Sequence, residues 1–170
     1  VVALRARTDT SAADGAAAQA EAAPERPAVQ PLELPLDHFL PHDYVPDERV
    51  RLQVYQELAA ATEEAQLKTL QRRLKDRFGT PPGPVENLLY SLRVKLAAQA
   101  AGLIAVNVDG DVLELRVPQG DGRDLAGIAA GHRHLQAQRT RLRFNWRADD
   151  DWQEQLLRIL GELAEQPVAA

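Results

Sequence analysis

The chain has 170 residues, which is enough for one domain with a core and a tail. It carries 20 basic and 25 acidic side chains, and this net charge of −5 disfavours a dedicated nucleic-acid binder, which usually has a basic excess. Because the sequence contains no cysteine, disulfides, thiol catalysis and zinc–thiolate sites are excluded. No apolar run is long enough to span a bilayer, and no signal-peptide pattern is present.

The first 31 residues are expected to lie outside the folded domain. Residues 1–7 are typical of the end of a preceding helix, and the absence of methionine, even at position 1, suggests a piece of a longer polypeptide. Residues 8–31 are rich in alanine, proline, glutamine and acidic side chains, so they cannot bury enough surface to offset the entropy of ordering. We therefore predict a flexible linker at 8–31 and a folded domain at 32–166.

The first half of this domain has a helical pattern. Residues 32–40 alternate apolar and polar side chains, but Pro35 and Pro41 argue against a central strand, so we expect an extended strap. A helix is predicted at about 47–61, and a second begins after an N-cap at Thr62 and ends at Phe78. A third helix is predicted to end near Gly102. Apolar residues recur at spacings of three and four in all three, which indicates a compact three-helix half.

The second half combines strands with helices. Two apolar runs flank Asp109-Gly110, which predicts a hairpin with a type I′ turn. Residues 123–136 are predicted to form a short helix, and residues 139–147 alternate as one strand. The last helix is expected to begin at the aspartate run 149–151. The prediction is an α+β fold, in which a three-helix half precedes a small sheet (a hairpin plus one strand) flanked by helices.

One face of the strand predicted at 139–147 is a candidate anion-binding face. Its arginines are Arg139, Arg141, Arg143 and Arg147. Phosphate contact is the functional interpretation, and a solvated strand face or a guarded sheet edge is the structural one. Because Phe144 and Trp146 alternate onto the other face, the pattern does not support base stacking.

Other chemical motifs are weak. The run Asp149-Asp150-Asp151 is read as metal ligands or, more simply, as an N-cap that favours the positive end of the last helix. His132 and His134 have the spacing of a metal pair on a strand, without a third ligand. No phosphate-binding loop occurs, and residues 120–122 read as an ordinary turn. We expect no catalytic, cofactor or metal site in this chain.

The end of the second helix, residues 72–79, contains one residue that helix chemistry does not explain. Leu74 and Phe78 are expected in the core, and the basic side chains complement the negative end of the helix. Asp76 places a negative charge near the negative end of the helix dipole, which is unfavourable. An ion pair with Arg72 or Arg73, one turn earlier, is the first explanation, and a binding partner is the second.

Two segments carry a family resemblance: LPHDYVPDERVRLQVYQELA at residues 40–59 and LKDRFGTPPGPVENLLYSLR at residues 74–93. They closely resemble the C-terminal domain of bacterial transcription-repair coupling factors, and the resemblance runs from about 32 to 163. It implies a cytoplasmic protein of nucleotide excision repair. The full-length family is an ATP-driven DNA translocase whose nucleotide (ATP and Mg²⁺) and helicase motifs lie in other domains. This fragment is therefore expected to be non-enzymatic.

The resemblance also implies partners. In the family, this domain folds back on the UvrB-like N-terminal module of the same protein and masks the surface that recruits UvrA, until the protein engages stalled RNA polymerase and DNA. Acidic residues before the family's R-F-G motif meet arginines of that module. Asp76 matches one acidic position, whereas the other is Arg73 here. The implied partner-binding residues are Asp76, Arg73 and Arg77, and no membrane contact is implied.

The resemblance leaves two points open. An arginine at position 73 would repel the arginines of the partner, so either the clasp is weaker or the partner surface has changed. Three other functions are alternatives: an accessory nucleic-acid-binding module that uses the arginine face, a metal hydrolase that uses the aspartate run, and a purely architectural end-piece.

Overall fold

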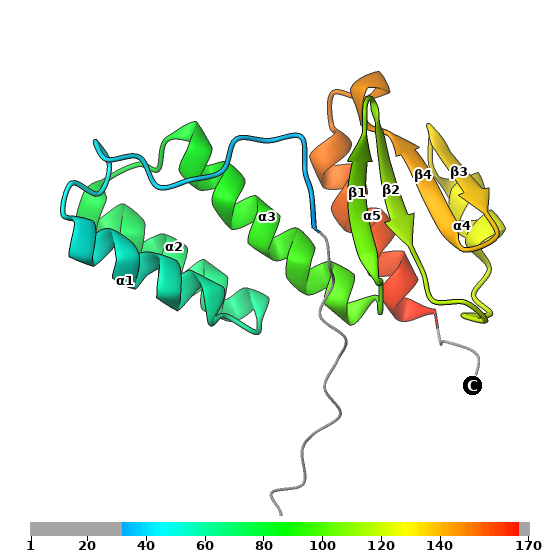
Figure 1. The fold of residues 1–170 in the computed structure, drawn as a ribbon, viewed down its shortest axis with the longest axis horizontal. Helices are drawn as coiled ribbons and strands as arrows, with labels where there is room; N and C mark the ends of the chain where they lie inside the picture. Colours follow the sequence, from blue (N-terminus) through cyan, green and yellow to red (C-terminus); the bar gives the residue numbers. More distant parts are fainter. Residues whose placement is uncertain (1–31, 167–170) are drawn as a thin grey trace, which may run out of the picture.

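A computed structural model describes residues 32–166, in which five α-helices and four strands follow the extended segment at 32–47 (Figure 1). The predicted end of a preceding helix at 1–7 and the predicted linker at 8–31 lie outside the described residues. The elements are α1 (Glu48–Ala59), α2 (Glu64–Phe78), α3 (Gly83–Ala100), β1 (Ala105–Asp109), β2 (Val112–Arg116), α4 (Leu125–Gly131), β3 (Leu135–Gln138), β4 (Arg141–Asn145), the short 3₁₀ helix η1 (Trp146–Ala148) and α5 (Trp152–Glu165). The predicted α+β class is confirmed.

Caps define the starts of the first two helices. Asp47 caps α1, because its carboxylate accepts hydrogen bonds from the amides of Arg49 and Val50 at 2.9 and 3.3 Å. The predicted cap of α2 is wrong, since the N-cap is Glu63 rather than Thr62. The backbone amide of Thr62 instead donates to the side-chain oxygen of Gln66, within α2, at 2.8 Å.

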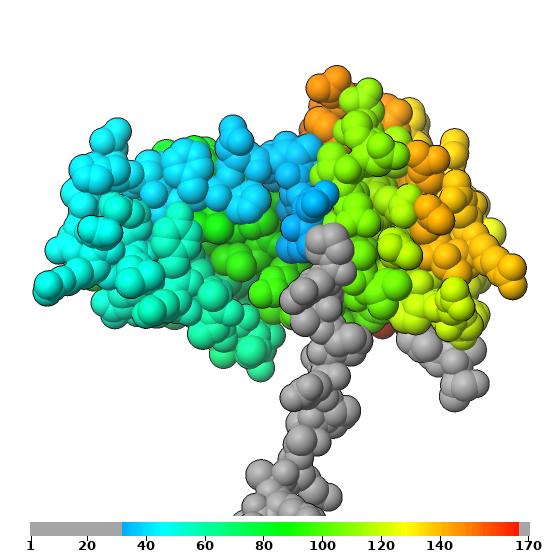
Figure 2. Space-filling model, viewed as in Figure 1, coloured from blue at the N-terminus to red at the C-terminus, as the bar shows by residue number. Residues whose placement is uncertain are grey.

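The strap predicted at 32–40 continues to residue 47 and contacts both halves of the domain. At one end Leu32 forms a parallel bridge with Val106 of β1. Further along, the amide of Leu40 donates to the hydroxyl of Tyr55 on α1 at 2.7 Å, and the side chain of Asn87 on α3 donates to the carbonyl of residue 37. Figure 2 shows this segment, in blue, lying across the molecule from the sheet to the first helices.

Helix α3 belongs to two apolar cores. Its first half, which includes Val85 and Leu89, packs with the strap, α1 and α2. Its second half, which includes Val94 and Ala98, packs with α5 and the sheet. Because one continuous helix supplies both cores, it fixes the helical half against the half that contains the sheet.

The sheet has four antiparallel strands in the order β1-β2-β4-β3, with α4 and α5 covering one face (Figure 1). The prediction of a hairpin plus one strand is therefore wrong in number. The helix predicted at 123–136 ends early at Gly131, because the chain reverses at His134, which has a positive φ of 60°. Leu135 then enters the core as the first residue of β3.

The hairpin between β1 and β2 is confirmed, but its predicted turn type is wrong. Asp109 pairs with Val112, so the two central residues are Gly110 and Asp111. Only Gly110 has a positive φ, of 58°, whereas a type I′ turn needs two such residues. Glycine at the first central position is the pattern of a type II′ turn. None of the helices within residues 32–166 is long and apolar enough to cross a bilayer.

Candidate partner-binding surface

The strap and Gly79 determine where α2 ends. Gly79 has φ 85° and ψ −167°, a region that essentially only glycine populates. The hydroxyl of Tyr44 donates to the carbonyl of Gly79 at 3.0 Å, and the ring of Tyr44 packs on Phe78 with 5.7 Å between centroids. Burial raises the pKa of Tyr44. The two segments that carry the family resemblance therefore meet at this helix end.

Asp76 lies exposed on the last turn of α2. Within residues 32–166, no basic group lies within 4.0 Å of its carboxylate. The ion pair expected with Arg72 or Arg73 is therefore not formed. The carboxylate therefore lies at the disfavoured end of the helix dipole with no counter-ion in the part of the chain that the structure describes, which leaves the second explanation, a binding partner, as the one to test.

Arg73 and Arg77 are held by other groups. The guanidinium of Arg73 pairs with Glu57 on α1, with 3.0 Å between Nη1 and Oε2. The guanidinium carbon of Arg77 lies 5.1 Å from the ring centroid of Phe78. The pair between Arg73 and Glu57 joins residues 16 positions apart, and for this reason the sequence pattern did not reveal it.

A groove of about 350 Å³ lies between α1 and α2 at this end of the helix pair. Its apolar lining consists of Val50, Val54, Leu70, Leu74 and Phe78. Its polar lining consists of Gln53, Glu57, Arg73, Asp76 and Arg77. All three residues that the resemblance implies as partner-binding therefore line one groove.

The predicted arginine face is wrong as a continuous row. Strand β4 begins only at Arg141, so Arg139 lies in the turn that joins β3 to β4, and Arg147 lies in η1. Acidic residues of the β1–β2 hairpin pair with three of the four arginines: Arg141 with Glu114 at 3.1 Å, Arg143 with Asp109 at 3.8 Å and Arg147 with Asp111 at 3.2 Å. This pairing weakens the attraction of the face for phosphate.

The aspartate run acts at the start of α5. One oxygen of Asp149 accepts from the amide of Asp151 at 3.1 Å, and the other accepts from the side chain of Gln155 at 2.6 Å. His132 and His134 lie in the turn between α4 and β3, so they are neither on a strand nor within the helix predicted at 123–136. In residues 32–166, no three His, Cys, Asp or Glu side chains gather as metal ligands.

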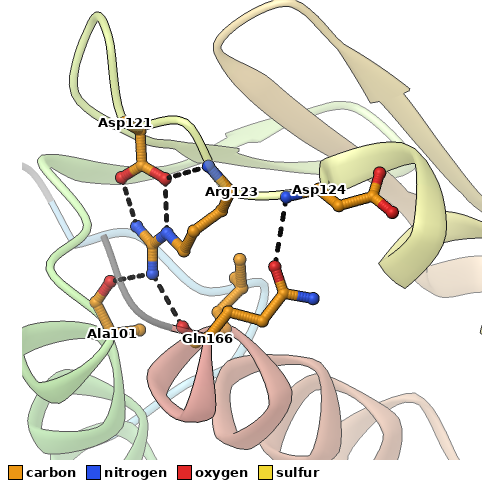
Figure 3. Close-up of polar contacts among 6 residues, drawn as sticks. Ala101, Asp121, Arg123, Asp124 and Gln166 are labelled. Atoms are coloured by element: carbon orange, nitrogen blue, oxygen red, sulfur yellow. Dashed lines mark hydrogen bonds and ion pairs between the residues drawn. The ribbon is translucent and has the colours of Figure 1, made fainter. Parts of the chain in front are cut away.

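A buried ion pair that the sequence pattern missed holds the loop before α4 (Figure 3). The guanidinium of Arg123 forks onto both carboxylate oxygens of Asp121, with 2.6 Å between Nη2 and Oδ2. Its Nη1 also donates to the carbonyls of Ala101, after α3, and Leu163, in the last turn of α5, at 2.6 and 2.7 Å. The segment read as an ordinary turn thus joins two helix ends, and only its Asp-x-Arg spacing hinted at this.

Known proteins share this architecture. The family model described as the TRCF domain matches residues 34–128, more than half of the chain. A solved structure of the C-terminal domain of a transcription-repair coupling factor is similar with a TM-score of 0.67 and 25% identity, covering 78% of this chain and 89% of that one.

Curated relatives agree with this match. Transcription-repair-coupling factors from Staphylococcus haemolyticus and Mycobacterium tuberculosis are each 34% identical, over 95 and 96 residues, and the one from Escherichia coli is 36% identical over 85 residues. These alignments cover 56%, 56% and 49% of this chain, but only 8%, 8% and 7% of the relatives. The chain belongs to the TRCF domain family, and its fold is that of the C-terminal domain of transcription-repair coupling factors.

Proposed function

We propose that this domain is a non-catalytic, autoinhibitory lid of a transcription-repair coupling factor. It binds the UvrB-like N-terminal module of the same polypeptide and masks the UvrA-binding surface of that module. Release of the lid follows when the translocase engages stalled RNA polymerase. The observation that supports this most directly is Asp76, an exposed acid with no counter-ion among residues 32–166, at a position where the family carries an acid that meets arginines.

The electrostatics suit a lid that must open. An exposed ion pair contributes only about 0.2–1 kcal/mol and weakens as salt rises, so a contact through Asp76 is reversible. Tethering both partners in one polypeptide raises their effective concentration and offsets this weakness. Switching between closed and open states requires a coupling of roughly 1–3 kcal/mol, which a few such contacts can supply.

The pair between Arg73 and Glu57 bears on the departure from the family pattern. An unpaired arginine at position 73 would repel the arginines of the partner. Here the carboxylate of Glu57 lies 3.0 Å away and offsets that charge. Repulsion is therefore reduced without an acid at position 73, and Asp76 can act as one of the contacts of the lid.

Binding between the 170-residue chain and the N-terminal module, measured by calorimetry over a salt series, tests the proposal. We expect affinity to fall as salt rises, and Asp76→Arg to weaken binding by about tenfold or more. Asp150→Arg is the matched control, because Asp150 is also exposed but lies before α5 in the other half of the domain. Arg73→Glu should strengthen binding if the module presents arginines. Equal affinities for all four proteins would contradict the assignment of this surface.

The regulatory part of the proposal needs the full-length protein. We expect UvrA to be captured more efficiently by a full-length protein that lacks this domain than by the intact protein. Asp76→Arg in the intact protein should raise capture toward the level of the truncated protein. Capture that is equal with and without the domain would instead indicate a purely architectural end-piece.

A further inference from the structure

We propose that the open edge of β3 binds an extended, acidic segment of a partner protein, which adds to the sheet as a further strand. This edge lies at the far end of the domain from α1 and α2 (Figure 1). The inference goes beyond the proposed lid and does not depend on the contact through Asp76, so either one can fail without the other.

The first argument is that β3 is an edge strand. The order β1-β2-β4-β3 leaves one side of β3 without a neighbouring strand in the part of the chain that the structure describes. The opposite edge of the sheet differs, because the strap bridges β1 through Leu32 and Val106. An open edge presents unpaired backbone amides and carbonyls, which are a template for strand addition by another chain.

The pairing of β3 with β4 determines which backbone groups face this edge. The amide of Asn145 donates to the carbonyl of His134 at 2.9 Å, so these two residues form a hydrogen-bonded pair. Hydrogen-bonded and non-hydrogen-bonded pairs alternate along two antiparallel strands. Leu135 and Ala137 therefore direct their backbone groups away from β4. Each of them offers one amide donor and one carbonyl acceptor to an added strand.

The second argument is the distribution of charge along this edge. Residues Leu135–Gln138 of β3 include neither a charged side chain nor a proline, which are the usual guards of an exposed edge. Arg133 precedes the strand and Arg139 follows it, and both are exposed.

The two flanking arginines are available to a partner. Within residues 32–166, no acid lies within 4.0 Å of the guanidinium of either Arg133 or Arg139. Arg139 also lines a hollow of about 630 Å³ between the β3–β4 turn and the loop before α4. A strand with carboxylates at both ends complements a neutral edge that has a cation at each end.

These charges disfavour two other occupants. If a second copy paired with β3 in antiparallel register around Gln136, Arg133 of each copy would lie opposite Arg139 of the other, and like charges opposite one another are destabilising. A nucleic acid would use the arginines but not the outward amides and carbonyls as a strand does. The net charge of −5 also disfavours a nucleic acid.

Binding of a short synthetic peptide to the 170-residue chain, measured by fluorescence anisotropy, tests the charge argument. The labelled peptide alternates valine and threonine in its centre and carries two aspartates at each end. We expect a Kd of about 1 mM or tighter, and binding at least about tenfold weaker for the same peptide with lysines at its ends. Arg133→Glu/Arg139→Glu should reverse this preference. Arg49→Glu/Arg72→Glu is the matched control, because it changes the charge equally on exposed residues of the helical half and should leave the preference unchanged.

Ala137→Pro tests whether the peptide adds as a strand. Proline removes the amide that faces the edge, and it is tolerated on an edge strand where that side is free. Affinity for the acidic peptide should fall by about tenfold or more, whereas Ala137→Ser, which keeps the amide, should bind within about twofold of the unmodified chain. Thermal unfolding checks that both variants are folded.

Hydrogen exchange of the unmodified chain, followed by NMR, gives a readout that needs no variant. The acidic peptide should slow the exchange of the amides of Leu135 and Ala137. Unchanged exchange of both amides, or equal binding of the acidic and basic peptides, would overturn the inference. Tighter binding of a single-stranded oligothymidine that Ala137→Pro does not weaken would also overturn it, since the face would then bind nucleic acid.

Discussion

Replacing Arg123 by methionine is expected to destabilise the domain strongly. The guanidinium is almost fully buried, with 1% of the side chain exposed, and it bonds to Asp121 and to the carbonyls of Ala101 and Leu163. Methionine has a similar length but cannot donate hydrogen bonds. The variant therefore leaves a buried carboxylate without its counter-ion and two carbonyl groups without these donors (Figure 3).

The expected loss follows from this burial. Asp121 has only 5% of its side chain exposed, so solvent cannot replace the lost partner. Removing one partner of a buried ion pair typically costs about 3–5 kcal/mol. Since domains of this kind have an unfolding free energy of roughly 5–15 kcal/mol, this is a large share of the total. At about 2 °C per kcal/mol, the melting temperature should fall by at least about 6 °C.

Urea denaturation followed by circular dichroism measures the change. The matched control is Arg147→Met, because Arg147 pairs with Asp111 on the surface with 67% of its side chain exposed, and its loss should cost about 1 kcal/mol or less. The double variant Asp121→Leu/Arg123→Met should recover part of the stability, since no charge is then left buried. A loss below about 1 kcal/mol for Arg123→Met would refute the reasoning.

Two further outcomes follow from backbone geometry and from charge. Gly79→Ala should destabilise the domain by about 1–3 kcal/mol, because alanine is strained at the φ and ψ angles of Gly79. Gly161→Ala should stabilise it by about 0.5–1 kcal/mol, because Gly161 lies inside α5 and the added carbon meets open space. The urea midpoints of the two variants should therefore shift in opposite directions. Burial raises the pKa of Glu64, but hydrogen bonds and charges from Lys68 and Arg93 outweigh it and hold the pKa below the ordinary value of 4.5. This carboxylate therefore stabilises the fold above that pH, and the stabilisation is lost as the pH falls through the pKa of the folded state. In the Glu64→Gln variant the urea midpoint should fall less steeply as the pH is lowered. The difference should be small because the side chain is half exposed. If the urea midpoint of Glu64→Gln falls with decreasing pH as steeply as that of the unmodified chain, the lowered pKa of Glu64 is contradicted.

Local chemistry made most of the helices predictable from the sequence. The apolar spacing of three and four, the cap at Asp47 and the glycine after Phe78 are decided within a few residues, and α1, α2 and α3 agree with their predicted positions. The errors occur where local preference is weak. Residues 135–138 alternate apolar and polar side chains, but over only four residues, the shortest run that indicates a strand, and their pairing with β4 decides that they form one.

The candidate site divides in the same way. The sequence placed Asp76, Arg73 and Arg77 on the last turns of one helix, because their spacing along a helix is local information. It did not show that Glu57 neutralises Arg73, because this contact depends on how α1 packs against α2. The prediction of a free arginine face was wrong for the same reason, because the acids that pair with these arginines come from the neighbouring β1–β2 hairpin.

By itself the sequence determined the family, the helical half and the unusual acid at the end of α2, because short motifs and helix periodicity are written in neighbouring residues. Only the tertiary structure decided which charges are neutralised, where a groove opens between two helices, and that Arg123 is buried. Each of these depends on the distance between groups far apart in the chain, and side-chain packing sets that distance.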